Sequence, residues 1–238
     1  MISVSILGAS GRMGALTKEL VDQDPNLKLH AALDSRSNPE SMLGADVVVD
    51  FTRPDVSEKL VEFAINHDQK VLVGTSGWSE LKLAKLERLL QSHSNAAVVV
   101  VPNFSVGSML AQRFATEAAK FFPHAEIVEA HHAGKEDSPS GTAIRTAELI
   151  SSARIEQPLV PGVDQEARGQ IVAGIPIHSI RLDGVSARQE TIFGADSEQL
   201  RINHDVISHR AYSLGILRAI EFTALATGIN IGLEKVLN

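Results

Sequence analysis

The first hundred residues alternate short, unbroken apolar runs with stretches whose apolar residues recur at helical spacing. Continuous apolar strands are typical of a parallel sheet that is covered on both faces. Strands that alternate with helices imply crossover connections of one hand. The pattern therefore predicts an α/β fold with a doubly wound parallel sheet over about residues 1–103. The expected strands are 2–7, 27–33, 45–51, 71–74 and 96–101, and the expected helices are 12–22, 56–67 and 79–92.

The pattern changes after Pro102, where long helices and one-sided strands replace the regular alternation. Leu200, Ile202 and His204 alternate with polar neighbours, as an antiparallel sheet with one exposed face requires. The second half is therefore expected to be α+β. Its expected helices are 106–122, with Leu110, Phe114 and Ala118 in its apolar stripe, then 142–152 and 212–227; its expected strands are 127–131, 177–182, 189–193 and 199–205.

Residues 154–176 are rich in proline and glycine and show no clear period. We expect a long loop there, acting either as a lid or as an arm between subunits.

Composition narrows the classes of protein that this chain can be. Its 238 residues are 44% hydrophobic and 21% charged, which excludes disorder and coiled coils, and the length fits one large domain or two small ones. The absence of cysteine excludes disulfides, thiolate metal sites and a cysteine nucleophile. The net charge of −7 argues against nucleic acid or membrane as a partner. No apolar run approaches the ~20 residues of a membrane span, and no signal peptide is evident, so we expect a cytoplasmic protein.

A glycine-rich turn joins the first expected strand to the first expected helix. Gly8, Gly11 and Gly14 permit a tight turn, close approach to a pyrophosphate and close helix–strand packing, and the helix start attracts phosphate. Asp34 ends the next strand, at the place where a Rossmann-type domain binds the adenosine ribose. The spacing GxxGxxG departs from GxGxxG, so the glycines alone do not name the cofactor. Ordinary turn chemistry is the alternative.

The choice between NADH and NADPH depends on the charges near Asp34. A carboxylate on the ribose favours NADH, whereas Arg12 and Arg36 are placed to pair with a 2′-phosphate. The hypothesis is use of both cofactors with some preference for NADH. Surface charge is the alternative reading of both arginines.

Two further segments follow the fourth and fifth expected strands, Gly74–Trp78 and Val101–Phe104. Ligands of open α/β sheets bind beyond the carboxyl ends of the strands. Both segments are therefore candidates for a nicotinamide pocket, although each taken singly is equally consistent with an ordinary turn.

The densest chemistry of the chain lies within Glu129–Ala143. His131, His132 and Lys135 place positive charge after an apolar strand, and Ser138 or Ser140 caps a helix that opens with Gly141 and Thr142. A helix start beside cationic groups suits a carboxylate ligand. The residues lack the HExxH spacing of a zinc site, so no metal is expected. A surface histidine pair near a helix cap is the other alternative.

On these motifs the chain resembles the 4-hydroxy-tetrahydrodipicolinate reductase family, in its short actinobacterial form. The resemblance covers essentially the whole length. Its most specific motif runs from Glu129 through Lys135 to Ala143. The supporting motifs are Gly8–Gly14, Asp50–Pro54, Gly74–Gly77, Pro102–Ser105, and His178–Arg181 with Glu190 and Phe193–Gly194.

The resemblance implies a reaction and roles for residues. NADH or NADPH reduces a small cyclic dicarboxylate, 4-hydroxy-tetrahydrodipicolinate, with loss of water, in diaminopimelate and lysine biosynthesis. His131 matches the family's acid/base and Lys135 its proton donor, while His132, Gly141 and Thr142 match its substrate contacts. The matching cofactor contacts are Gly8, Ala9, Ser10, Gly11, Arg12, Met13, Asp34, Gly74, Thr75, Ser76, Val101, Pro102, Asn103 and Phe104.

The resemblance also implies an organisation. It predicts a dinucleotide-binding domain from residues 1–103 and 211–238, and a substrate-binding and oligomerisation domain with an open mixed sheet from 104–210. Family members are usually homotetramers. Small departures from the family pattern occur at Ser76, Trp78 and Ser138, and none removes a polar group that the chemistry needs.

Two other functions stay open at this point. One is another two-domain dehydrogenase of amino-acid metabolism, although the phosphorylating semialdehyde dehydrogenases need a cysteine that is absent. The other is a non-catalytic sensor of NAD(P), against which the presence of His131 and Lys135 argues.

Overall fold

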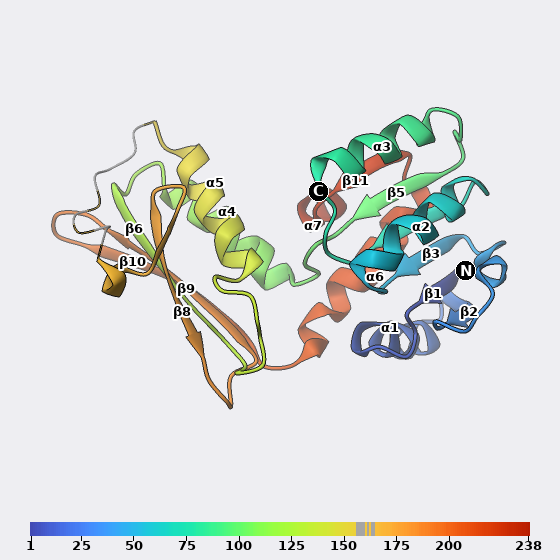
Figure 1. Cartoon of the computed structure of the whole chain (residues 1–238), viewed down its shortest axis with the longest axis horizontal. Helices are drawn as coiled ribbons and strands as arrows, with labels where there is room; N and C mark the ends of the chain where they lie inside the picture. The colour runs from blue at the N-terminus through green and yellow to red at the C-terminus, as the bar shows by residue number, and fades with distance from the viewer. Residues whose placement is uncertain (156–159, 161, 163–164) are drawn as a thin grey trace. The chain divides into compact units, whose positions relative to one another are not determined.

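The computed structural model describes residues 1–155, 160, 162 and 165–238. The chain forms two compact units (Figure 1). The first unit comprises Met1–Val106 and His209–Asn238, and the second unit comprises Gly107–Ser208.

The first unit contains a six-stranded parallel sheet in the order β11-β5-β4-β3-β1-β2. All four residues of β3 and of β5 are buried, as expected for strands that are covered on both faces. The strands are β1 (Ile2–Leu7), β2 (Leu27–Leu33), β3 (Val47–Asp50), β4 (Lys70–Val73), β5 (Ala97–Val100) and β11 (Gly228–Ile231).

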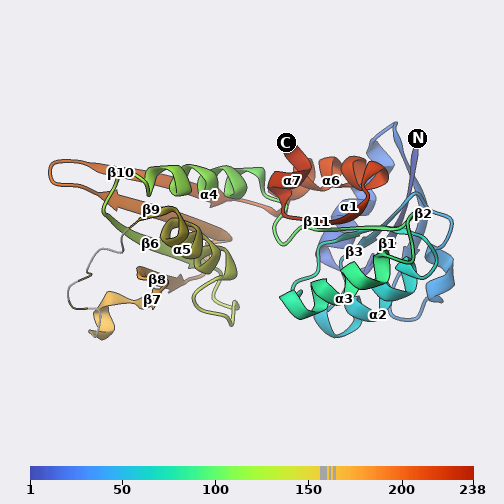
Figure 2. The same cartoon turned by 90° about the horizontal axis from the view of Figure 1, so that it is seen from above.

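Helices cover both faces of this sheet (Figure 2). α1 (Arg12–Gln23) and α6 (Ser213–Leu225) pack together on one face, and α2 (Pro54–Ile65) and α3 (Glu80–Leu90) pack together on the other. The short elements η1 (Pro39–Met42), η3 (His209–Tyr212) and α7 (Leu233–Leu237) complete the unit. The prediction of a doubly wound parallel sheet is confirmed.

Strand β11 is the element of this sheet that the periodicity did not predict. The expected helix 212–227 ends at Leu225 as α6, and the chain re-enters the sheet as a sixth strand beside β5. Gly228 adopts a φ of +60°, a conformation that side chains disfavour, so it suits the reversal between helix and strand. A strand of four residues is too short to give a clear pattern of its own.

The second unit contains a five-stranded mixed sheet in the order β10-β9-β6-β8-β7. β6 pairs in parallel with β8, and the other neighbours are antiparallel. The open mixed sheet is therefore confirmed. Its strands are β6 (His124–His131), β7 (Gln170–Val172), β8 (Ile175–Arg181), β9 (Ala187–Gly194) and β10 (Gln199–Val206).

One face of the second sheet is covered by α4 (Val106–Ala118) and α5 (Gly141–Ala153), and Ile127 and Phe193 pack among their small residues. The expected apolar stripe of α4 was wrong in part, because Phe114 is 56% exposed. Ala118 is buried as expected, and Ala115 faces the core in place of Phe114. Small side chains allow the helix to approach the sheet closely, a choice that hydrophobicity alone does not reveal.

The expected long loop at 154–176 is shorter than predicted, because η2 (Glu166–Arg168), β7 and the start of β8 lie within it. Residues 156–159, 161 and 163–164, where a lid or arm was expected, lie outside the described residues. Over the described part of the chain, no helix combines the length and the apolar character that crossing a membrane requires.

Candidate active site

The glycine turn lies between β1 and α1, as predicted. Gly8 has a φ of +74°. A Cβ atom added to Gly14 would lie 2.2 Å from the carbonyl oxygen of Gly8, so the first turn of α1 can approach the loop only because this position has no side chain. Gly11 is the N-cap of α1, and no side chain among the described residues caps that helix start. The N–H groups of the first helical turn therefore remain suited to an anion.

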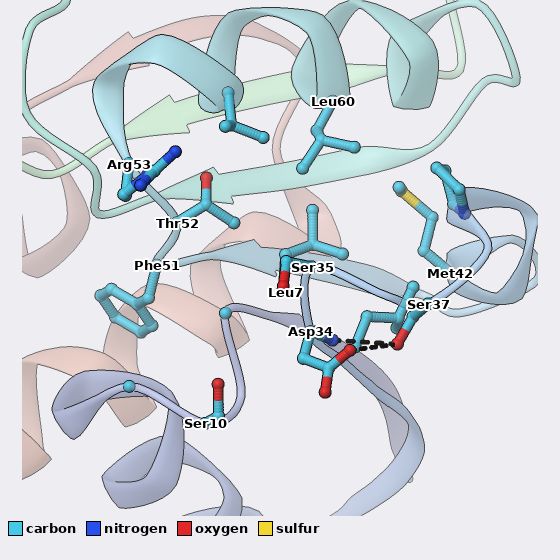
Figure 3. Close-up of a pocket in the computed structure, with 15 residues that line it drawn as sticks. Leu7, Ser10, Asp34, Ser35, Ser37, Met42, Phe51, Thr52, Arg53 and Leu60 are labelled. Carbon is cyan, nitrogen blue, oxygen red and sulfur yellow. Dashed lines mark hydrogen bonds between the residues drawn. The ribbon is translucent and has the colours of Figure 1, made fainter.

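A pocket of about 550 Å3 opens beside this turn (Figure 3). It brings together Gly8, Ser10, Gly11 and Asp34 of the predicted cofactor residues. Ala9, Arg12 and Met13 lie in the same turn and helix start but do not line the pocket. The other lining residues are Leu7, Leu33, Ser35, Ser37, Pro39, Met42, Phe51, Thr52, Arg53, Val56 and Leu60.

Asp34 follows β2 and is held with its carboxylate at the pocket. Its Oδ1 accepts hydrogen bonds from the backbone N–H of Arg36 (2.9 Å) and from the Ser37 hydroxyl (3.2 Å). The Arg36 guanidinium, which is 89% exposed, lies 3.2 Å from Oδ2. The pKa of Asp34 is below its ordinary value, chiefly because of the bond from the Arg36 backbone. Asp34 is therefore an ionised acceptor at physiological pH.

Thr52 and Arg53 are pocket residues that the prediction omitted. The loop that carries them is anchored by Asp50, which is fully buried at the end of β3. Asp50 accepts hydrogen bonds from the backbone N–H (3.0 Å) and the hydroxyl (2.5 Å) of Thr52, and from the Ser57 hydroxyl. The motif Asp50–Pro54 was the signal in the sequence that could have located this wall of the pocket.

The segments Gly74–Ser76 and Val101–Phe104 do not line the pocket, but the structure brings them together. The Gly74 N–H donates to the Asp50 carbonyl (2.9 Å), and the Val101 N–H donates to the Val73 carbonyl (2.8 Å). A Cβ atom on Gly74 would meet the rings of Phe51 and Phe104, whose centroids are 5.4 Å apart. Both segments thus meet beyond the carboxyl ends of neighbouring strands, where α/β sheets bind ligands.

The histidine–lysine cluster lies in the second unit, at the end of β6. His131 Nδ1 is 2.6 Å from Oε2 of Glu129, which lies two residues earlier on the same face of the strand and is fully buried. Arg181 of β8 binds both oxygens of that carboxylate, each at 2.9 Å. Neither Glu129 nor Arg181 was among the predicted site residues, although both stood in the quoted motifs.

Lys135 and the start of α5 complete the cluster. Lys135 Nζ donates to the Asp137 carboxylate (2.6 Å), and the Lys135 N–H donates to the His132 carbonyl (3.1 Å). Ser140 is the N-cap, since its hydroxyl accepts from the Ala143 N–H (3.3 Å), and α5 begins at Gly141. The predicted capping residue is confirmed, with Ser140 in the role rather than Ser138.

The charges of this cluster influence one another. Burial lowers the pKa of His131, Lys135 and Arg181 act in the same direction, and Glu129 opposes them. Burial alone would raise the pKa of Glu129, but its hydrogen bonds, led by those of Arg181, hold it below its ordinary value. His131 is thus a mainly neutral imidazole beside an ionised carboxylate at neutral pH. Such a group is suited to exchange a proton.

Acid should weaken the second unit because of Glu129. Its pKa is lowered by folding, so its stabilisation is present above the unfolded value of about 4.3 and is lost as the pH falls through the lower folded value. We expect the urea midpoint of unfolding to fall between about pH 5 and pH 3. Glu129→Gln should be less stable at pH 7, by about 3 kcal/mol, because Arg181 loses its buried partner, and should depend less on pH. The exposed Glu148→Gln is the control; an equal acid loss in Glu129→Gln would contradict the assignment.

Known proteins resemble this chain over its whole length. Family models described as the N-terminus and the C-terminus of dihydrodipicolinate reductase match residues 2–104 and 107–237. A 4-hydroxy-tetrahydrodipicolinate reductase of Clavibacter sepedonicus is 49% identical over 238 residues, covering 99% of this chain and 86% of the relative. One from Cutibacterium acnes (strain DSM 16379 / KPA171202) is 41% identical over 243 residues, covering 100% and 99%.

A solved structure agrees with these sequences. The dipicolinate-bound dihydrodipicolinate reductase of Paenisporosarcina sp. TG-14 superposes with a TM-score of 0.87 at 30% identity, and the match covers 100% of both chains. Two family models, full-length relatives and a shared fold therefore agree: the chain belongs to the dihydrodipicolinate reductase family.

Proposed function

We propose that this chain is an NADH- or NADPH-dependent reductase that converts 4-hydroxy-tetrahydrodipicolinate, with loss of water, to tetrahydrodipicolinate in diaminopimelate and lysine biosynthesis. The observation that carries the proposal is the cluster of His131, Lys135 and the α5 N-terminus in a chain of this family. A relative that binds dipicolinate, a planar dicarboxylate, supports a substrate of the same class.

The first unit fits a dinucleotide. Its glycine turn leaves no room for a Cβ atom at Gly14, and its helix start and Asp34 suit a pyrophosphate and a ribose. Gly8, Ala9, Ser10, Gly11, Arg12 and Met13 would hold the pyrophosphate end, and Gly74–Ser76 with Val101–Phe104 would flank the nicotinamide. When bound, the cofactor supplies a hydride.

The second unit would bind the substrate. The first N–H groups of α5, at Gly141 and Thr142, and the ring of His132 would hold one carboxylate and thereby orient the ring. Hydride addition to a conjugated C=C–C=N system leaves negative charge at the far atom. Lys135 would stabilise that charge and donate a proton, and His131 would act as acid and base.

The assay that tests the proposal is oxidation of NADH, followed by its absorbance, with 4-hydroxy-tetrahydrodipicolinate generated enzymatically. Turnover is expected with either cofactor. Cofactor binding without turnover would instead support the alternative of a non-catalytic NAD(P) sensor.

Asp34 should set the preference between the two cofactors. We expect Asp34→Ser to lower kcat/KM for NADH about tenfold or more, because a charged acceptor of the ribose hydroxyls is lost, and to change kcat/KM for NADPH less. The wild-type chain should use both cofactors; a preference for NADPH of more than about a hundredfold would contradict the role of Asp34. Asp55→Ser, which removes an exposed carboxylate near Arg53, is the matched control.

We further propose that the two units correspond to a dinucleotide-binding domain, 1–103 with 211–238, and a substrate-binding and oligomerisation domain, 104–210. The proposed assembly is a homotetramer in the cytoplasm. The second sheet supports it, because α4 and α5 cover only one face and Val128, Ile180 and Ile192 alternate onto the other. Ile180 is 45% exposed.

A measurement of molar mass tests the assembly. Light scattering should give about four times the 25.6 kDa of the chain. Ile180→Glu should lower the mass, because a charge in the middle of an apolar contact is costly, whereas Ile207→Glu, at a 93% exposed position, should not. A monomeric wild-type chain would overturn this part of the proposal.

A further inference from the structure

Glu129 has no role in the reaction as derived so far, yet its carboxylate is buried in the second unit's site and accepts several hydrogen bonds there. It is fully buried on β6, and its two oxygens accept several hydrogen bonds. The donors include the two guanidinium nitrogens of Arg181 at 2.9 Å, His131 Nδ1 at 2.6 Å and the Ser140 N–H at 3.2 Å. A carboxylate taken out of water in this way is retained only where its partners satisfy it fully.

The contact with His131 settles which ring nitrogen faces outward. Because Glu129 is ionised, it only accepts hydrogen bonds, so Nδ1 of His131 must carry a proton. The remaining nitrogen, Nε2, is then the one with a lone pair. A carboxylate that holds Nδ1–H in this manner selects both the tautomer and the orientation of a working imidazole.

The contacts of Arg181 extend the same network to the segment that carries Lys135. One guanidinium nitrogen also donates to the backbone carbonyl of Asp137 (2.6 Å), whose carboxylate accepts from Lys135 Nζ. The Ser140 N–H that reaches Glu129 belongs to the N-cap of α5. One buried carboxylate thus connects the histidine, the lysine segment and the start of the anion-binding helix.

Glu126, three residues earlier on β6, provides an internal comparison. It also pairs with an arginine and a histidine: Arg168 at 2.5 Å and His178 at 2.8 Å. Its side chain points to the opposite face of the sheet, because three residues along a strand reverse the direction. The same chemistry therefore occurs twice on one strand, and only Glu129 contacts a proposed catalytic residue.

We propose that Glu129 is a positioning residue of the reductase site, which holds His131 with Nε2 toward the substrate and, through Arg181, fixes the segment that carries Lys135. The proposal rests on the proposed function for the meaning of His131 and Lys135. The hydrogen-bond network itself does not depend on it.

The tautomer of His131 is the first test and needs no variant of Glu129. Nitrogen-15 NMR of the labelled wild-type chain, with His131→Asn used only to assign the signals, reports which nitrogen of the neutral ring is protonated. We expect protonated Nδ1 and unprotonated Nε2. A ring protonated at Nε2, or one averaging between the two forms, would overturn the proposal.

The second test compares Glu129→Gln with Glu126→Gln. The amide in Glu129→Gln can donate to Nδ1 and so favour the wrong tautomer, and we expect kcat to fall by about 10²–10⁴-fold with little change in NADH affinity. Glu126→Gln, measured where its assembly has the same molar mass as that of the wild-type chain, should keep kcat within about twofold of the wild-type value. If kcat of Glu129→Gln decreases by less than about fivefold, the proposal is overturned.

The pH profile separates positioning from a general loss of structure. Glu129, which lies on the same strand as His131, raises the pKa of His131, whereas Lys135 and Arg181 lower it. The inflection of the pH profile of kcat that reports the titration of His131 should therefore move to lower pH in Glu129→Gln. In Glu126→Gln it should stay at the wild-type pH. If Glu129→Gln does not fold, the wild-type tautomer decides. If the wild-type chain shows no reductase activity, the proposed function fails, while the tautomer still decides whether Glu129 orients His131.

Discussion

Replacing Lys135 with alanine will lower kcat by about 10²–10⁴-fold and leave the affinity for NADH within about threefold of the wild-type value. The ammonium group is proposed to stabilise and protonate the charge that hydride addition creates, so its loss affects the transition state. It lies in the second unit, where it pairs with Asp137 at 2.6 Å, whereas the glycine turn belongs to the first unit. Steady-state kinetics together with fluorescence titration of NADH measures both quantities.

Lys120→Ala is the matched control for this variant. Lys120 also pairs with a neighbouring carboxylate, Glu117 at 2.7 Å, but it is exposed and lies outside the cluster from Glu129 to Thr142. Its removal should leave kcat unchanged, since exposed ion pairs contribute little. A Lys135→Ala chain with normal turnover at saturation and weakened NADH binding would contradict the assignment of Lys135.

Replacing Gly14 with alanine should abolish measurable NADH binding and destabilise the first unit by about 3 kcal/mol. The added Cβ would lie 2.2 Å from the Gly8 carbonyl oxygen and 2.7 Å from the Ala9 Cα. These are backbone atoms that cannot move without opening the turn that is proposed to hold the pyrophosphate. Thermal unfolding followed by circular dichroism should show a midpoint that is lowered by roughly 10 °C.

Alanine variants of two other glycines should show smaller losses of NADH affinity and stability than Gly14→Ala. In Gly11→Ala the new Cβ would lie 3.3 Å from the Gly8 carbonyl oxygen, so a smaller loss of affinity and stability is expected. In Gly194→Ala no described atom lies within 4 Å, so neither property should change. Equal behaviour of Gly14→Ala and Gly194→Ala would show that close packing at the turn does not support the cofactor site.

Much of the fold could be predicted because its signals are local. The unbroken apolar runs of β1, β3 and β5 and the helical spacing of α1 reflect their own burial, which is a property of short segments. The glycine turn could also be predicted, since Gly8 has a positive φ and Gly11 and Gly14 approach the backbone of Gly8, all within seven residues. The histidine–lysine cluster was found because its members lie close together along the chain.

Other parts could not be predicted because they depend on contacts between distant segments. β11 is recognisable as a strand only beside β5, with which it pairs. Phe114 was expected in the core because it is apolar and at helical spacing, but it is exposed. The side chains of α4 that pack against the sheet include those of Ala115 and Ala118. The pocket wall at Thr52 and Arg53 depends on the buried carboxylate of Asp50, whose partners are not evident from hydrophobic pattern.

By itself, the sequence determined the class of each unit, the glycine turn, Asp34 and the cluster from His131 to Thr142, and its motifs indicated the family. These features arise from periodicity, from backbone demands and from residue types that are neighbours in the chain. Only the tertiary structure decided that Arg181, 52 residues from Glu129, binds the carboxylate that also holds His131. Parallel pairing of β6 with β8 creates that contact, because strand register, and not distance along the chain, sets which side chains meet.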